Sequence, residues 1–286
     1  MPMRARNAML GAGACVTLLA LVWFAAFHVG FFSHLDQSIY LQFADLTAHG
    51  RIAWIAGHFV RLFGPDPYVY LVVILLVAAL LRRRPRVVLA VGAIVLGANV
   101  TTEVLKHVLA APRPASLFPG GVSSLPAASW PSGHATAVMA LVLASVLAAP
   151  ARLRPVVAAL GASLAIAVGY SLLVRGTHYP SDVLGGFLVA GSWALCTVAA
   201  LLTAERRWAT GRGSHERVSI RAALGAPGAV IVAALVLSLV LVAVRTHDVV
   251  SYLQAHTSFV LGAAGIAVLS LAVSTGVVLS VRRYSR

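Results

Sequence analysis

Eight long apolar stretches, separated by short polar segments, constrain the fold of this chain more than any other feature. Each is long enough, or nearly long enough, to cross the hydrocarbon core of a bilayer as a helix. Their approximate bounds are 9–32, 68–81, 87–110, 134–149, 153–175, 181–203, 227–245 and 259–281. The chain is therefore predicted to be an all-α integral membrane protein.

The composition excludes the main soluble classes. Hydrophobic residues make up 60% of the 286 residues and charged residues only 10%, whereas soluble domains carry about 25% charged residues. A soluble globular enzyme, a disordered chain and a disulfide scaffold are all incompatible with these values. Cys15 and Cys196 both lie inside apolar stretches, which is typical of small buried side chains rather than of a disulfide or a metal pair.

The basic residues predict how the chain is oriented. The net charge is +14, but most basic residues lie in short loops between apolar stretches, so no nucleic-acid partner is expected. Of the 22 Lys and Arg residues, 16 fall at the N-terminus, in segments 82–86, 152–154 and 206–221, and after residue 281. Because positive charge gathers on the cytoplasmic side, both termini are predicted to be cytoplasmic. Segment 33–67 then lies outside and is predicted to hold one or two interfacial amphipathic helices, with a plain connecting loop as the alternative.

Three outer segments contain a large share of the polar residues: 106–114, 131–134 and 175–182. Lys106 is the only lysine in the chain, which suggests a need for a compact charge; a snorkelling lysine is the alternative. Arg113 lies between two prolines that stiffen its backbone, and its guanidinium suits phosphate oxygens. Lipid-headgroup binding without chemistry is the alternative role for Arg113.

The other two segments carry an anion site and a histidine–carboxylate pair. Pro131-Ser132-Gly133-His134 has the residues of a helix start, whose free N–H groups and dipole attract anions. His178 and Asp182 are four residues apart, and a carboxylate there fixes the imidazole tautomer. A purely structural pair and a zinc site are the alternatives, and zinc is disfavoured because the surroundings are cationic.

Together these groups suit the chemistry of a transferring phosphoryl group. Cations and backbone donors stabilise its spread negative charge. One histidine can attack phosphorus, and the other can protonate the leaving oxygen. This inventory requires no metal and no cofactor.

The three segments resemble the type-2 phosphatidic acid phosphatase superfamily, which also includes the vanadium haloperoxidases. The family pattern is Lys-x6-Arg-Pro, then Pro-Ser-Gly-His, then Ser-Arg-x5-His-x3-Asp, and the resemblance covers about residues 87–203. It implies a six-helix core, no metal, and removal of phosphate from lipid phosphates or pyrophosphates. It also implies that His178 is the nucleophile, Asp182 orients it and His134 is the general acid. The phosphoryl oxygens would be held by Lys106, Arg113, Ser132 and Gly133.

One position departs from the family pattern. Leu172 stands where the family has an arginine. We hypothesise that Arg175, about one helical turn nearer the outer surface, supplies the missing phosphate-binding charge; a weakened or non-catalytic relative is the alternative. Glu103 is a possible supporting residue, as an ion-pair partner of Lys106 or Arg113 or as an acceptor of a substrate proton.

The sequence thus predicts a multi-pass lipid phosphatase of the cytoplasmic membrane whose active site faces the exterior. The predicted parts are a six-span core at 1–203 with its motifs at 103–182, a basic cytoplasmic linker at 204–226, and a two-span extension at 227–286. Undecaprenyl pyrophosphate, phosphatidylglycerol phosphate and phosphatidic acid are compatible substrates. The expected partners are this substrate and membrane lipids, with homo-oligomerisation left open. The rival functions are a lipid or sugar phosphotransferase and a non-catalytic protein that binds or transports lipid phosphates.

Overall fold

The computed structural model describes residues 3–109, 111, 127–207, 219–244, 251 and 254–281, and every regular element within them is a helix. Six of these helices are long and apolar enough to cross a membrane, or seven if α3 and α4 form one bent span. The predicted all-α membrane fold is therefore confirmed. The helices are α1 (Met3–His28), α2 (Gly30–Asp45), α3 (Gly50–Leu62), α4 (Pro65–Leu81), α5 (Pro85–Val108), α6 (Gly133–Ala148), α7 (Arg154–Val174), α8 (Pro180–Arg207), α9 (Ile220–Val244) and α11 (Thr257–Val281).

The helix bounds differ from the apolar stretches in three places. Helix α1 ends at His28 rather than near residue 32, because Val29 is extended and α2 begins at Gly30. The helices predicted within 33–67 are present as α2 and α3, and α3 meets α4 at an angle of 52°. The predicted 227–245 span is helix α9, whose described apolar run, Ala223–Val236, is shorter than a full bilayer crossing.

Local sequence signals fix where several helices begin. Proline occupies the first turn of α4, α5, α7 and α8, where its missing N–H has no intrahelical partner to lose. Helix α6 instead begins after Ser132, whose Oγ accepts a hydrogen bond from the backbone N–H of Ala135 at 3.4 Å. The predicted serine cap is therefore present.

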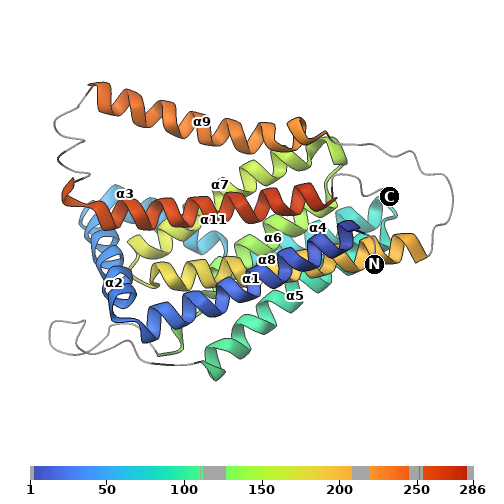
Figure 1. Ribbon diagram of the computed structural model, residues 1–286, viewed down its shortest axis with the longest axis horizontal. Helices are drawn as coiled ribbons and strands as arrows, with labels where there is room; N and C mark the ends of the chain where they lie inside the picture. The colour runs from blue at the N-terminus through green and yellow to red at the C-terminus, as the bar shows by residue number, and fades with distance from the viewer. Residues whose placement is uncertain are drawn as a thin grey trace.

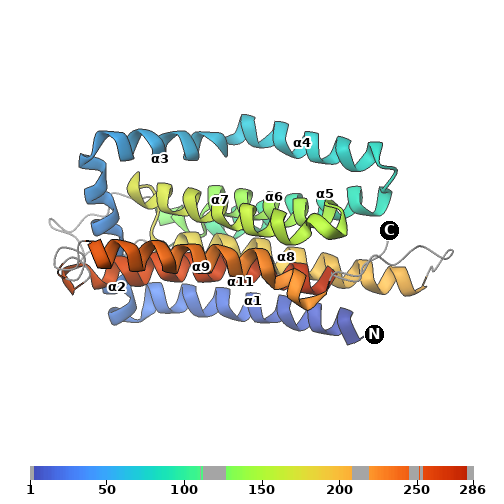
Figure 2. The same cartoon turned by 90° about the horizontal axis from the view of Figure 1, so that it is seen from above.

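The helices run side by side, and their ends form two separate faces (Figures 1 and 2). One face contains the start of α1 and the end of α11, and the other contains α2 and the start of α3. At the first face, Arg84 Nη1 donates to Ala148 O and Arg154 Nη1 donates to Val281 O, each at 2.7 Å. At the second face, α5 ends, α6 begins, α7 ends and α8 begins. The described residues of the three motif segments, 106–109, 131–134 and 175–182, therefore share one end of the bundle.

The centre of the bundle is formed by α6, α7 and α8. Helix α6 packs against α5, α7 and α8, and α8 packs against α1 on its other side. Helix α11 also belongs to this packing, since it contacts α7, α8 and α2 and buries Ile266 completely. Helix α9 packs against α7 and α11. The two C-terminal helices thus differ, because α11 contributes to the central core and α9 covers its surface.

Candidate active site

The starts of α6 and α8 are joined directly. The backbone N–H of Ser132 donates to the carbonyl oxygen of Asp182 at 2.9 Å, and Trp130 Nε1 donates to Ser181 O at 3.2 Å. The side chains of Trp130, Ser132 and Asp182 are almost or completely buried. Two motif segments fifty residues apart are therefore fixed to each other through their backbones.

Two glycines on α8 permit this contact. A Cβ atom at Gly186 would lie 2.8 Å from both Ser132 O and the backbone nitrogen of Thr136. A Cβ at Gly185 would lie 2.9 Å from Trp130 Nε1. Real side-chain carbons cannot approach backbone atoms this closely, so the approach of α8 to α6 requires glycine at position 186.

His178 and Asp182 form the predicted pair at the start of α8. His178 Nδ1 lies 3.3 Å from Asp182 Oδ2, and the same carboxylate oxygen accepts the backbone N–H of Tyr179 at 3.0 Å. The Asp182 side chain is fully buried, and that of His178 is 14% exposed. Because Asp182 faces Nδ1, it favours the tautomer with the proton on Nδ1 and leaves Nε2 with a free lone pair.

Lys106 lies over the start of α6. Its Nζ would be 3.1 Å from a Cβ atom placed on Gly133, and it donates a hydrogen bond to Glu103 Oε1 at 2.7 Å. The Lys106 side chain is 21% exposed, against 59% for Glu103. The ammonium group therefore lies next to Gly133 at the start of α6, and Glu103 forms the ion pair with Lys106 that was one of the roles suggested by the sequence.

His134 lies in the first turn of α6, and its side chain is partly buried. Lys106 Nζ lies next to the neighbouring Gly133, and Asp182 is bonded to Ser132. His134, Lys106 and His178 therefore lie at the same end of the bundle. The start of α6 adds the positive end of its helix dipole to this end of the bundle, whereas the N–H groups of Tyr179 and Ser181 at the start of α8 donate to the carboxylates of Asp182 and Asp36.

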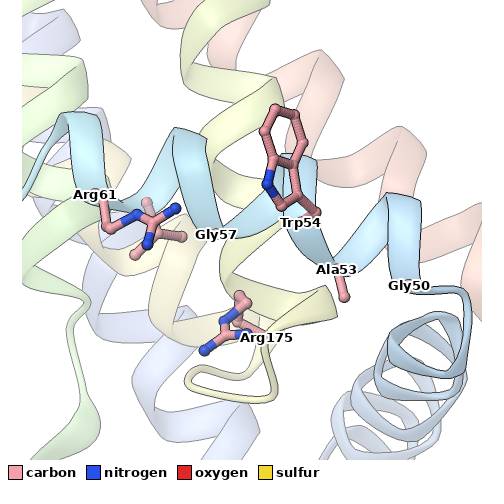
Figure 3. A pocket seen from close by; sticks show the side chains of 7 residues that line it. Gly50, Ala53, Trp54, Gly57, Arg61 and Arg175 are labelled. Atoms are coloured by element: carbon pink, nitrogen blue, oxygen red, sulfur yellow. The ribbon is translucent and has the colours of Figure 1, made fainter.

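The two predicted arginines have different outcomes. Arg113 belongs to segment 112–126, which is outside the described residues. Arg175 is exposed on the turn after α7 and lines a pocket of about 440 Å³ against α3 (Figure 3). Leu172, at the position of the family arginine, is buried in the core. That Arg175 replaces the arginine missing at Leu172 thus remains a prediction. In the structure, the Arg175 side chain lines the pocket against α3.

The sequence analysis did not identify the residues of α2 and the following turn that bind segment 174–181, which leads into the start of α8. Asp36 accepts hydrogen bonds from Ser181 N at 2.9 Å and Ser181 Oγ at 2.6 Å. Tyr40 donates its hydroxyl to Gly176 O at 3.2 Å, and Thr47 donates to Val174 O at 2.6 Å. The one available signal was Asp36 itself, an isolated carboxylate in an apolar segment, because intramembrane charges need a partner.

The arrangement is suited to binding and attacking a phosphate. An imidazole with a free Nε2, a second imidazole and an ammonium group lie at the same end of the bundle as the start of α6, and such groups stabilise a developing phosphoryl charge. Within the described parts of the chain, no three His, Cys, Asp or Glu side chains come together as metal ligands.

The comparisons with known proteins agree with this geometry. The family model described as PAP2 superfamily matches residues 87–208, which contain all three motif segments. No curated protein and no solved structure shows significant similarity to the chain. Members of the matching family are phosphatases, which supports phosphoric ester hydrolysis as the general activity. Residues 87–208 are therefore similar to the PAP2 superfamily, and α5, α6, α7 and α8, four of the six helices able to span a membrane, largely make up this region.

Proposed function

We propose that the protein is a membrane lipid phosphatase that acts through a phosphohistidine on His178, without a metal. The observation that carries this proposal is the buried Asp182 carboxylate 3.3 Å from His178 Nδ1, on a helix start that is bonded to the start of α6. This contact directs the free lone pair of His178 away from the carboxylate. Transfer of a phosphoryl group to an enzyme requires at least a nucleophile next to a site that binds the anion.

In the first step, His178 Nε2 attacks phosphorus and the bond between phosphorus and the leaving oxygen breaks. His134 donates a proton to that oxygen, so that the lipid leaves as an alcohol, or as a monophosphate if the substrate is a diphosphate. Asp182 balances the charge that His178 gains when its nitrogen bonds to phosphorus. Lys106, the hydroxyl group of Ser132 and the backbone N–H of Gly133 stabilise the phosphoryl oxygens, since the backbone N–H of Ser132 is already donated to Asp182 O. Arg113 is proposed as a further donor to them.

In the second step, water attacks the phosphohistidine from the side that the lipid has vacated. His134, now neutral, accepts a proton from this water, and the bond between Nε2 and phosphorus breaks. Inorganic phosphate leaves, and both histidines return to their starting protonation states. One group serves as acid and then as base, as expected for two chemically related half-reactions.

A lipid substrate at the outer face fits the position of the site. The site lies at one end of a bundle of apolar helices, so a phosphate there can remain attached to a chain that stays in the bilayer. The opposite end carries Arg82, Arg83, Arg84 and Arg152 on described turns. The positive-inside rule favours a cytoplasmic location for this basic end, which supports a site at the exterior of the cytoplasmic membrane. Carrier-lipid diphosphates such as undecaprenyl pyrophosphate, and glycerophospholipid phosphates, are the proposed substrates.

Phosphate release by the purified full-length protein in detergent tests the proposal. A panel of lipid mono- and diphosphates is assayed in EDTA, with His178→Ala as the control. We expect release by the wild type and none by the variant. Loss of wild-type activity in EDTA, or normal turnover by His178→Ala, would contradict the mechanism. Product analysis with an added lipid or sugar acceptor distinguishes hydrolysis from phosphotransfer, and binding without release would indicate a non-catalytic protein.

A further inference from the structure

A pocket of about 440 Å³ lies between α3 and the turn that joins α7 to α8. Its walls are mainly small or apolar, but they include Arg61 from α3 and Arg175 from the turn (Figure 3). Trp54, one turn of helix before His58, lies on the same wall and is 65% exposed. The pocket therefore combines two cations with an apolar surface of the kind found at the membrane interface.

The two arginines have no carboxylate partner among the residues that the structure describes. Arg61 Nη2 instead lies 3.3 Å from His58 Nε2, and His58 Nδ1 lies 2.8 Å from the carbonyl oxygen of Trp54. This network holds Arg61 in place without neutralising it. Like charges that share a pocket repel each other, so an anion between them is stabilised by both.

The pocket is coupled to the catalytic histidine by a short, braced turn. Arg175 and His178 are three residues apart, so their Cα atoms lie within about 11 Å of each other. Hydrogen bonds from Tyr40 and Thr47 hold the backbone of this turn at Gly176 and Val174. Arg175 lines the α3 pocket, while His178 lies beside Asp182 at the start of α8. The same turn thus carries a residue of the pocket and leads directly to a residue of the candidate active site.

We propose that this pocket, lined by Arg61, Arg175 and Trp54, is a second phosphate subsite that selects lipid diphosphates over lipid monophosphates. The distal phosphate reacts at His178, and the proximal phosphate, joined to it by one bridging oxygen, lies between the two guanidinium groups. The first carbon atoms of the lipid contact Trp54 and the apolar wall. The inference rests on the proposed phosphatase function and makes Arg61 a residue that determines its specificity.

The test compares kcat/KM for a prenyl diphosphate and for the prenyl monophosphate of the same chain length. Arg61→Gln removes the charge and is expected to reduce the ratio of diphosphate to monophosphate kcat/KM about tenfold, the effect of one charge-assisted contact. Arg61→Lys retains the charge and should recover part of the ratio. An equal loss for both substrates, or no change in the ratio, would overturn the inference.

A second variant fills the pocket without removing a charge. Gly57 lines the pocket, and a Cβ atom placed there meets no atom within 4 Å. Gly57→Leu should therefore fold normally and lower the same ratio. Gly13→Leu on α1 is the matched control, because its Cβ also meets open space and Gly13 is not among the pocket residues. A ratio as low in Gly13→Leu as in Gly57→Leu would contradict the assignment.

Binding to the inactive His178→Ala protein separates this inference from the proposed function. Titration with a prenyl methylenediphosphonate and with the matching monophosphonate is expected to show tighter binding of the diphosphonate, and the added substitution Arg61→Gln should abolish that preference. Competition by inorganic pyrophosphate shows whether the subsite needs the lipid chain; we expect weaker binding than for the prenyl compound. Equal affinity for both phosphonates would refute the subsite even if the wild type is an active phosphatase. If the wild type releases no phosphate but the protein still binds the diphosphonate more tightly than the monophosphonate, the proposed phosphatase function is refuted and the subsite is not.

Discussion

Asp36 on α2 accepts two hydrogen bonds from Ser181, one from the backbone nitrogen at 2.9 Å and one from Oγ at 2.6 Å. Both residues are buried, and 145 positions separate them in the sequence. Ser181 immediately precedes Asp182, and its carbonyl oxygen accepts the indole N–H of Trp130. Helix α2 therefore determines where the first turn of α8 lies, and with it the carboxylate that orients His178.

Replacement of Asp36 by alanine should weaken both the fold and the site. The variant leaves the N–H and hydroxyl groups of Ser181 without this acceptor, at a cost of about 1.5–3 kcal/mol for hydrogen bonds to a charged group. We expect a lower melting temperature in detergent and a lower kcat for phosphate release. Asp45→Ala at the exposed end of α2 is the control, with a change within about 0.5 kcal/mol. Indistinguishable melting temperatures for the two variants would show that the Asp36 contact contributes little.

The loss of activity caused by removing the His134 imidazole should depend on the leaving group of the substrate. As general acid, His134 is expected to contribute roughly 10²–10⁴-fold to the departure of a lipid alcohol, which is a poor leaving group. A p-nitrophenyl phosphate needs little proton donation. His134→Ala should therefore lose much more activity on the lipid substrate than on the nitrophenyl ester, measured as the ratio of the two kcat/KM values. The same loss on both substrates would assign His134 to phosphate binding instead.

Alanine at Gly186 should separate α8 from α6. Its Cβ would lie 2.8 Å from two backbone atoms that belong to the start of α6, and backbone atoms cannot move aside as a flexible side chain can. We expect a lower melting temperature and loss of phosphate release. Gly92→Ala on α5 is the control, since its Cβ meets no atom within 4 Å and alanine favours helix by about 0.5–1 kcal/mol. A Gly186→Ala protein as stable and active as Gly92→Ala would show that the contact is not required.

Truncation of Ile266 tests whether α11 is structurally required. Ile266 is completely buried, whereas Leu261 on the same helix is 58% exposed. Ile266→Ala should lower the free energy of unfolding by about 2 kcal/mol, the low end of the range for soluble cores, because lipid rather than water surrounds the bundle. Leu261→Ala should lower it much less. Thermal unfolding of both variants in the same detergent decides the question, and equal stabilities would mean that α11 contributes little to the core.

The apolar stretches predicted the fold because the requirement for burial in a bilayer acts on each segment separately. The proline and serine helix starts were predictable for the same reason, since capping is local. The basic segments 82–86 and 152–154 also lie at the same end of the bundle, as their charge suggested. The sequence did not predict the bend of 52° between α3 and α4, because a break next to Gly64 and Pro65 does not reveal its angle.

The residues proposed as catalytic could be selected from three short motifs, but the residues that support them could not. Lys106, His134, His178 and Asp182 lie at one end of the described bundle, as the motif spacing and topology required. Asp36 and Tyr40 act through contacts with residues about 140 positions away, and nothing in the local sequence names those partners. The position of Arg175 depends on how the turn after Val174 faces α3, which periodicity alone cannot determine.

The start of α6 lies at the site, and its positive end consists of peptide groups rather than side chains. Peptide N–H groups do not titrate, and among single substitutions only those to proline remove one. Part of the attraction for phosphate should therefore persist in alkaline solution and in a chain that lacks its one lysine. A Lys106→Met protein would then still concentrate anionic headgroups at this end of the bundle, while turning them over slowly.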